Sequence, residues 1–307
     1  MGGAGQIVPP GPIALAMPGR RARWATAAVR VGRRWPIIIG GALGLLVVSA
    51  ALLAPVVSPH DPIRIDVRQR LAGPSGSHVL GTDELGRDIL SRLIAGARVS
   101  LYVGVVSVGI ALGLGLPLGL LGGFYRGRLD AIIMRLLDAL LAFPAILLAL
   151  AIVAMLKPNL TNAMIAIGIV SIPSFARLSR ASVMAVHHFE YVEAARACGA
   201  SDLYLVLRTI LPNCLAPILI QVSVGFADAV VTEAALSFLG LGIQPPMPSW
   251  GSMLAIGRVY LTDSPLYALS VGTALSVTVL SLSLPGDELR DILDPQLRSF
   301  AGSRVSS

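Results

Sequence analysis

The run GIALGLGLPLGLLGG, residues 109–123, carries no charged side chain and contains several glycines. It lies inside a mostly apolar segment, residues 97–124, which exceeds the roughly 20 residues that a helix needs to cross the hydrocarbon core of a membrane. Glycines on such a helix let a neighbouring helix approach closely. We therefore predict a membrane-spanning helix packed against other helices. A glycine-rich phosphate loop does not fit, because neither a strand nor a lysine accompanies the run.

Five further segments are long and apolar enough to span a membrane. The chain has 307 residues, of which 55% are hydrophobic and 13% charged, a composition typical of a membrane protein. The expected fold class is all-α, a polytopic membrane bundle of about six transmembrane helices. A kink is expected at Pro144, inside the third span. The other predicted spans are residues 36–57, 131–156, 162–184, 212–241 and 266–284.

The predicted spans divide the chain into regions. These are an Arg-rich tail at 1–35, the first span at 36–57, an extracytoplasmic segment at 58–95, a core of five spans at 96–285 with a polar loop at 190–212, and a C-terminal tail at 286–307. A cleaved signal peptide is the alternative for the first span, but its apolar core is usually only about 7–15 residues long.

Two features flank these spans. Leu85, Ile89 and Leu93 repeat at helical spacing, which predicts a short amphipathic helix at the membrane surface before the second span. Trp250 lies in the proline-containing loop between the last two spans, and we place it at the depth of the membrane interface.

Composition argues against several function classes. The net charge is +7, but the basic residues form no stripe interleaved with aromatics, so no nucleic-acid partner is expected. Lys157 is the only lysine, which excludes a Lys-bearing phosphate loop. His187 and His188 are adjacent and point in different directions on a helix, with no further ligands nearby. We expect no metal site, no cofactor and no catalytic residues.

The distribution of basic residues predicts the orientation. With six spans, the side that holds both termini carries more than twice as many basic residues as the other side. Both termini are therefore expected in the cytoplasm, and so is the loop between the fourth and fifth spans. The N-terminal tail contributes Arg20, Arg21, Arg23, Arg30, Arg33 and Arg34 without any acidic residue.

That cytoplasmic loop contains EAARACGASDLYLVLRTILPN, residues 193–213. Gly199 interrupts a run of helix formers, and Ser201 followed by Asp202 is a typical N-terminal cap. We predict two short helices joined at a bend, the second ending near Ile210, with the chain entering the membrane at Pro212. The alternative is a surface helix lying against lipid headgroups.

The sequence also resembles a known family. EAARACGA (193–200) followed by ILPN (210–213) resembles the EAA loop of ABC importer permeases. Further segments resemble the dipeptide/oligopeptide/nickel branch of that family, and within it the subunit conventionally lettered C. They are LGTDELGRDILSRLIAGARVSL (80–101), LLDALLAFPAILLAL (136–150), EAALSFLGLG (233–242), PSWG (248–251) and GDELRDILDPQL (286–297).

The resemblance implies a function and a set of partners. A second permease subunit would complete a heterodimeric pore in the bacterial inner membrane, two cytoplasmic ATPase subunits would bind ATP, and an extracytoplasmic binding protein would deliver the substrate. The EAA loop would be a coupling helix seated in a groove of an ATPase. The substrate implied is a peptide, with nickel, glutathione or another small solute as alternatives. The expected coupling residues are Glu193, Ala194, Ala195, Gly199, Leu211 and Pro212.

Three acidic residues fall within predicted spans. Asp228 and Glu233 lie in the fifth span, where charge is costly and usually faces the bundle interior or water. They are candidates for a translocation path or gate, and a helix–helix contact is the alternative. Asp138, in the third span, is expected to pair with Arg135 or with another arginine.

Other transport and enzyme classes fit less well. A secondary transporter driven by an ion gradient can use broken helices and buried acids, but it usually carries paired repeats, and none is evident. An intramembrane enzyme needs a nucleophile–base pair or a ligand cluster within the spans, and we find neither.

Overall fold

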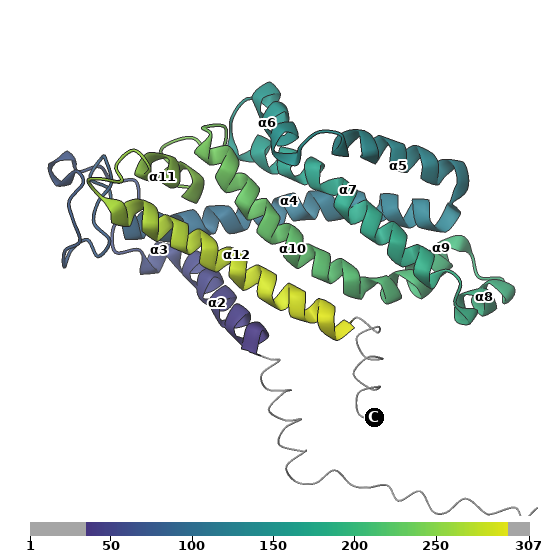
Figure 1. Cartoon of the computed structure of the whole chain (residues 1–307). Helices are drawn as coiled ribbons and strands as arrows, with labels where there is room; N and C mark the ends of the chain where they lie inside the picture. The colour runs from purple at the N-terminus through teal and green to yellow at the C-terminus, as the bar shows by residue number, and fades with distance from the viewer. Residues whose placement is uncertain (1–34, 294–307) are drawn as a thin grey trace, which may run out of the picture.

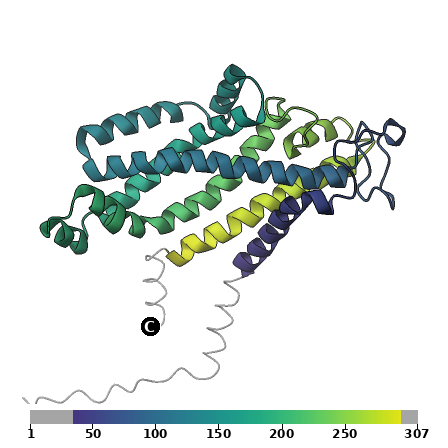
Figure 2. The same cartoon turned by 180° about the vertical axis from the view of Figure 1, so that it is seen from behind.

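A computed structural model describes residues 35–293 of the chain, so most of the two predicted tails lies outside the described residues. The described part is helical, and its only β-type pairing is an isolated bridge between Thr82 and Asp88. Figures 1 and 2 show long helices running side by side from one end of the molecule to the other. The predicted all-α bundle is confirmed.

Each of the six predicted spans corresponds to a helix or a helix pair. Four helical stretches are long and apolar enough to cross a membrane: Ile89–Tyr125, Leu160–Val186, Asp202–Phe238 and Pro265–Leu284. The third predicted span is a bent pair, and the first is a shorter apolar helix, Ile37–Leu52. The elements are α2 (Trp35–Leu52), α3 (Ala54–Val57), η1 (Val67–Gln69), α4 (Ile89–Tyr125), α5 (Gly127–Leu141), α6 (Ala145–Leu156), α7 (Leu160–Val186), α8 (Glu190–Ala197), α9 (Asp202–Tyr204), η2 (Leu205–Ile210), α10 (Leu211–Phe238), α11 (Trp250–Gly257) and α12 (Pro265–Leu293).

The bend in the third span lies at the predicted kink. Helices α5 and α6 meet at 86°, and Pro144 is the residue before α6. Proline has no N–H to continue the hydrogen-bond ladder and disfavours helical geometry at the residue before it, Phe143. Two ion pairs hold α5 against α7: Arg180 Nε to Asp130 Oδ1 at 2.5 Å, and Arg177 Nη2 to Asp138 Oδ1 at 2.5 Å. The expected arginine partner of Asp138 is thus Arg177.

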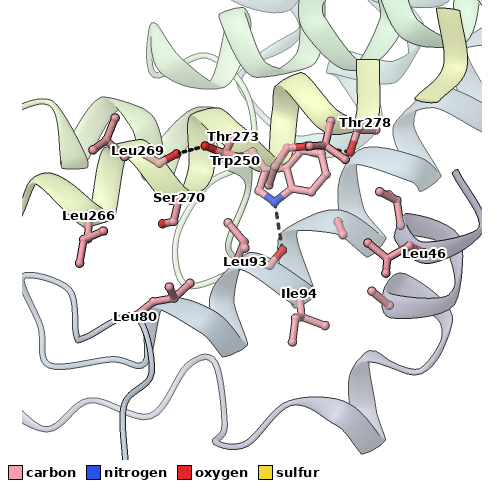
Figure 3. Close-up of a pocket in the computed structure, with 15 residues that line it drawn as sticks. Leu46, Leu80, Leu93, Ile94, Trp250, Leu266, Leu269, Ser270, Thr273 and Thr278 are labelled. Carbon is pink, nitrogen blue, oxygen red and sulfur yellow. Dashed lines mark hydrogen bonds between the residues drawn. The ribbon is translucent and has the colours of Figure 1, made fainter. Parts of the chain in front are cut away.

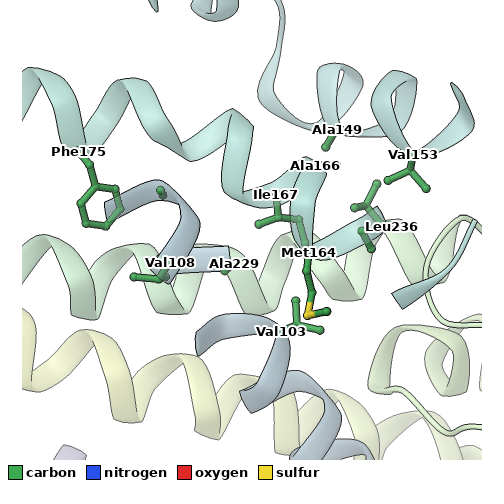
Figure 4. Close-up of a cluster of buried hydrophobic side chains, with 12 residues drawn as sticks. Val103, Val108, Ala149, Val153, Met164, Ala166, Ile167, Phe175, Ala229 and Leu236 are labelled. Atoms are coloured by element: carbon green, nitrogen blue, oxygen red, sulfur yellow. The ribbon is translucent and has the colours of Figure 1, made fainter. Parts of the chain in front are cut away.

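The glycines of residues 109–123 act as the sequence predicted. Helices α4 and α7 form the most extensive helix contact of the described chain. A Cβ atom on Gly115 would lie 2.8 Å from the carbonyl oxygen of Ile172, and one on Gly119 would overlap the carbonyl oxygen of Ala176. Gly113 faces open space instead. The close approach places the core between α4, α6, α7 and α10, where Val103, Val153, Met164 and Leu236 meet (Figure 4).

The predicted amphipathic surface helix is wrong as a separate element. Residues 82–88 form a turn closed by the Thr82–Asp88 bridge, and α4 then runs without a break from Ile89 to Tyr125. The Asp88 side chain accepts a hydrogen bond from Ser91 N and so caps the helix. The helical spacing of Ile89 and Leu93 therefore belongs to the first turns of the second span.

The bundle has two distinct ends. Segment 58–88 and α11 lie at one end, and α8 and α9 lie at the other (Figures 1 and 2). Trp250, expected at the membrane interface, is only 2% exposed at the start of α11, and its Nε1 donates to the Leu93 carbonyl at 3.0 Å (Figure 3). It packs beside an apolar cavity of about 490 Å³ between α2, α4 and α12. The large apolar ring contributes more when buried than at an interface, and its single N–H is satisfied.

Candidate coupling site

Helix α8 stands at the end of the bundle and buries one apolar side chain fully. Val192 is 1% exposed and packs with Val183 and Val186 at the end of α7 and with Phe124 of α4. Glu193 and the small Ala194 are exposed. The helix therefore presents a short polar face to the surroundings while its underside is fixed to the bundle.

The predicted bend after α8 is confirmed and has a defined geometry. Gly199 has φ +83°, in the left-handed region that favours glycine. Its N–H donates to the Arg196 carbonyl at 3.0 Å, and Ala200 N donates to the Ala195 carbonyl at 3.1 Å. This hydrogen-bond pair is a Schellman C-cap, and the half-buried Ala195 and Ala200 supply its apolar contact.

The chain after the bend differs from the predicted second short helix. Ser201 caps it as expected, accepting from Tyr204 N at 3.4 Å, but the helix continues through Pro212 to Phe238. A π-helical turn, η2, precedes the proline, and Leu211 N bonds to the Val206 carbonyl in its register. Asn213 Nδ2 donates to the Thr209 carbonyl at 2.7 Å. The irregular π turn directly precedes Pro212, which has no N–H to continue the helical hydrogen-bond ladder.

The cap and the π turn fix α8 to α10 through one apolar cluster. Leu205 and Ile210 of η2 are fully buried and belong to the same cluster as Val192. Leu211 is half-buried against it, whereas Pro212 is exposed. The six residues expected to couple therefore divide into an exposed group, Glu193, Ala194, Gly199 and Pro212, and an inward-packing group, Ala195 and Leu211.

Two arginine–histidine contacts join α8 and the end of α4 to the end of α7. Arg196 Nη2 lies 3.3 Å from His187 Nε2, and Arg126 Nη2 lies 3.0 Å from His188 Nε2. Burial, followed by the charges of Arg126, Arg196 and His188, lowers the pKa of His187. A neutral His187 imidazole can accept a hydrogen bond from the Arg196 guanidinium, so this contact holds α8 to the end of α7. The Arg196 guanidinium also stacks over the Phe124 ring, 5.8 Å from its centroid.

Glu233 is enclosed within the bundle. Its side chain is 0% exposed and accepts hydrogen bonds from Ser237 Oγ at 2.7 Å and Ser100 Oγ at 3.3 Å. Ser237 Oγ also accepts from Ile243 N at 3.2 Å, in the loop before α11. The glutamate therefore connects α10, α4 and that loop, close to the end of the bundle opposite α8.

Asp228 has a different environment on the same helix. It is exposed on α10, and no ion-pair partner for its carboxylate occurs within residues 35–293. Five residues separate it from Glu233, so the two carboxylates lie on different faces of the helix. The Glu233 carboxylate is therefore enclosed within the bundle, whereas the Asp228 carboxylate lies on the exposed surface of α10.

The membrane-length helices define an integral membrane protein, and the polar helix α8 with its bend lies exposed at one end of the bundle. Residues 115–299 match the family model described as the binding-protein-dependent transport system inner membrane component. The chain belongs to this family and is a multi-pass inner-membrane protein.

Curated relatives and one solved structure agree with this assignment. The chain is 48% identical over 272 residues to the di/tripeptide transport system permease protein DppC of Pseudomonas aeruginosa, covering 85% of this chain and 90% of the relative. It is 42% identical over 280 residues to the glutathione transport system permease protein GsiD of Pectobacterium atrosepticum, covering 91% and 93%. A chain of the inward-facing MetNI methionine ABC transporter shares the fold, with a TM-score of 0.57 and 19% identity over 67% of this chain and 98% of that one.

Proposed function

We propose that the chain is one of two different permease subunits of an ATP-driven importer of peptides. In this assembly it forms half of the translocation pore, two cytoplasmic ATPase subunits supply the energy, and an extracytoplasmic binding protein delivers the substrate. Similarity to the di/tripeptide permease of Pseudomonas aeruginosa supports a peptide substrate. The relative named for glutathione makes that tripeptide the second candidate.

The observation that carries the proposal is the geometry of α8. Val192 fixes the helix to α4, α7 and η2, while Glu193 and Ala194 face outward. An ATPase that binds this face and moves on binding ATP displaces α8 as a rigid body. The shared apolar cluster transmits the displacement to three long helices. Small Ala194 allows the partner's backbone to come close.

The inward-packing residues transmit the motion. Ala195 forms the apolar contact of the Schellman cap, and Leu211 joins η2 to α10. Pro212 and the π turn make this junction the least regular part of a 37-residue helical stretch. We propose that the backbone angles change slightly at this junction, and that these changes let α10 move with α8.

For the two acids in α10 we propose different roles. Asp228 is exposed, so we assign it to the surface of the translocation path, where a carboxylate attracts the amino terminus of a peptide. Glu233 is enclosed, so we assign it to fixing α10 to α4 and to the loop before α11.

The orientation follows the distribution of basic residues. We place α8 in the cytoplasm together with both termini, and segment 58–88 with α11 on the opposite side, facing the binding protein. The location of these elements at opposite ends of the bundle supports this arrangement.

Reconstitution tests the function directly. The chain is assembled in proteoliposomes with its partner permease and ATPases, and ATP hydrolysis and uptake of a labelled dipeptide are measured with and without the binding protein. We expect dipeptide-loaded binding protein to stimulate both. Uptake driven by an ion gradient without ATP would contradict the proposal and favour a secondary transporter, whereas stimulation by glutathione alone would assign the substrate to the second candidate.

A further inference from the structure

Two histidines and an aspartate, distant in sequence, converge at the start of α4. His60 and His78 stack with ring centroids 4.6 Å apart and 29° between their planes. Their Nδ1 atoms approach the same carboxylate, with His78 Nδ1 2.9 Å from Asp88 Oδ1 and His60 Nδ1 3.9 Å from Asp88 Oδ2. One ligand atom from each residue fits within 4.8 Å of the others.

The backbone around the cluster is fixed to the first turn of α4. Ser91 Oγ donates to Asp88 Oδ2 at 2.7 Å and accepts from the His60 backbone N–H at 3.0 Å. Two residues further along the loop, Arg92 Nη1 donates to the Pro62 carbonyl at 3.0 Å. The His60 ring is therefore held beside Asp88 although its side chain is 40% exposed.

A hydrogen-bonded helix cap explains only part of this arrangement. His78 can donate from Nδ1 to Asp88, and Asp88 caps α4 through Ser91. The ring of His60 makes no hydrogen bond with any of the described residues, and the loop nevertheless presents its Nδ1 to the same carboxylate. A second imidazole aimed at a carboxylate that is already bonded points to a ligand shared by all three side chains.

We propose that His60, His78 and Asp88 bind a divalent transition-metal ion, best matched by Zn²⁺, with one coordination position open. Two imidazoles and one carboxylate suit zinc better than Mg²⁺ or Ca²⁺, which prefer oxygen ligands. Around a tetrahedral zinc ion, bond lengths of about 2.0–2.2 Å separate ligand atoms by about 3.3 Å. One ligand atom from each of the three residues lies within 4.8 Å of the others, so side-chain movements of about 1–1.5 Å bring them to that value.

The open position faces the side of the exposed ligand. His60 lines a cavity of about 1150 Å³ together with Tyr102 of α4 and Met247 of the loop before α11, so the cluster borders this cavity on the His60 side. A bound ion links residues 58–62 to the capped start of α4. The metal thereby stiffens the end of the permease that lies opposite α8.

Metal binding is testable without any transport assay. The full chain is purified with an affinity tag free of histidine, stripped with a chelator and titrated with Zn²⁺ while its thermal midpoint and metal content are measured. We expect one equivalent of zinc per chain and, at a hundredfold excess over Kd, a rise of roughly 5–10 °C in the midpoint.

Variants distinguish zinc binding at this cluster from zinc binding at the other histidines. His60→Ala removes an exposed ligand, so the metal-free midpoint should stay unchanged while the zinc-induced rise is lost. Asp88→Asn retains a side-chain oxygen that can cap α4 but should weaken zinc binding at least tenfold. The double variant His187→Ala with His188→Ala alters the remaining two histidines of the chain and should retain the rise.

Three results would overturn the proposal. They are a wild-type chain that takes up no stoichiometric zinc, a His60→Ala chain that keeps the full rise in midpoint, and a His187→Ala, His188→Ala chain that loses it. Because the readout is binding, a failure here is distinguishable from a failure of the peptide-import proposal.

Discussion

At the scale of single residues, backbone geometry and burial decide which of the predicted site residues can contact a partner or a substrate. The sequence marked Gly199 as a break, and the structure gives the cause, a positive φ that completes a C-cap. It also gave Asp228 and Glu233 the same candidate role, in a translocation path or gate. Their different burial could not be read from the sequence, because it depends on Ser100, which lies more than a hundred residues away in α4.

Gly199→Val tests the cap. A β-branched residue at positive φ costs roughly 1–2 kcal/mol and would reorient α8, so we expect at least a tenfold loss of ATPase stimulation and uptake. Gly199→Asn should retain most activity, because asparagine tolerates the left-handed region. Gly113→Val is the matched control, since Gly113 also faces open space but lies within a regular helix. Equal uptake by Gly199→Val and Gly113→Val would contradict the role of the cap.

Glu233 is expected to affect stability more than transport chemistry. Glu233→Leu leaves the hydroxyls of Ser100 and Ser237 without their partner and should cost about 1–3 kcal/mol, measured as a lower thermal midpoint in detergent. Glu233→Gln can still bond both serines and should be nearly neutral. Asp228→Asn, on the exposed face, should keep the midpoint and reduce uptake. A Glu233→Leu chain as stable as wild type would refute the assigned role.

At the scale of elements, the sequence predicted spans better than their junctions. Length and apolar composition located the six predicted segments, because a membrane span requires both. The short helix expected from Leu85 is instead the start of α4, and the helix expected to stop near Ile210 continues into α10. Both errors arose where a proline or a glycine-containing turn stands beside a helix, since the hydrogen bonds that decide such junctions come from neighbouring elements.

Because α4 packs closely on α7, we expect substitutions of different glycines in α4 to differ sharply in their effect on stability. Gly119→Val places side-chain atoms against the backbone of α7 and should cost about 1–3 kcal/mol through overpacking, which lowers the thermal midpoint by several degrees. Gly113→Val in the same helix meets open space and should change the midpoint little. Similar midpoints for the two variants would show that the approach of α4 to α7 is looser than described.

At the scale of the whole molecule, the two ends for which we propose functions are separated by the length of the bundle. The arrangement follows from alternating spans, which the sequence predicted, together with the distribution of arginines. The convergence of His60, His78 and Asp88 was not predictable, because the three residues follow no short metal-binding spacing and meet only through the folding of segment 58–88 onto α4. Long-range contacts of this kind are set by the tertiary structure.

Native cysteines allow the central claim to be tested with few changes to the protein. Cys198 follows α8 and is exposed, whereas Cys214 in α10 is buried. In the assembled transporter, a reagent with a maleimide at one end and a photoreactive benzophenone at the other, attached at Cys198, should cross-link this chain to an ATPase subunit, and impermeant maleimides should reach Cys198 only from the cytoplasmic side. Cys198→Ser should abolish the cross-link and Cys214→Ser should retain it. Labelling of Cys198 from outside the cell, or cross-links to lipid alone, would contradict the coupling role of α8.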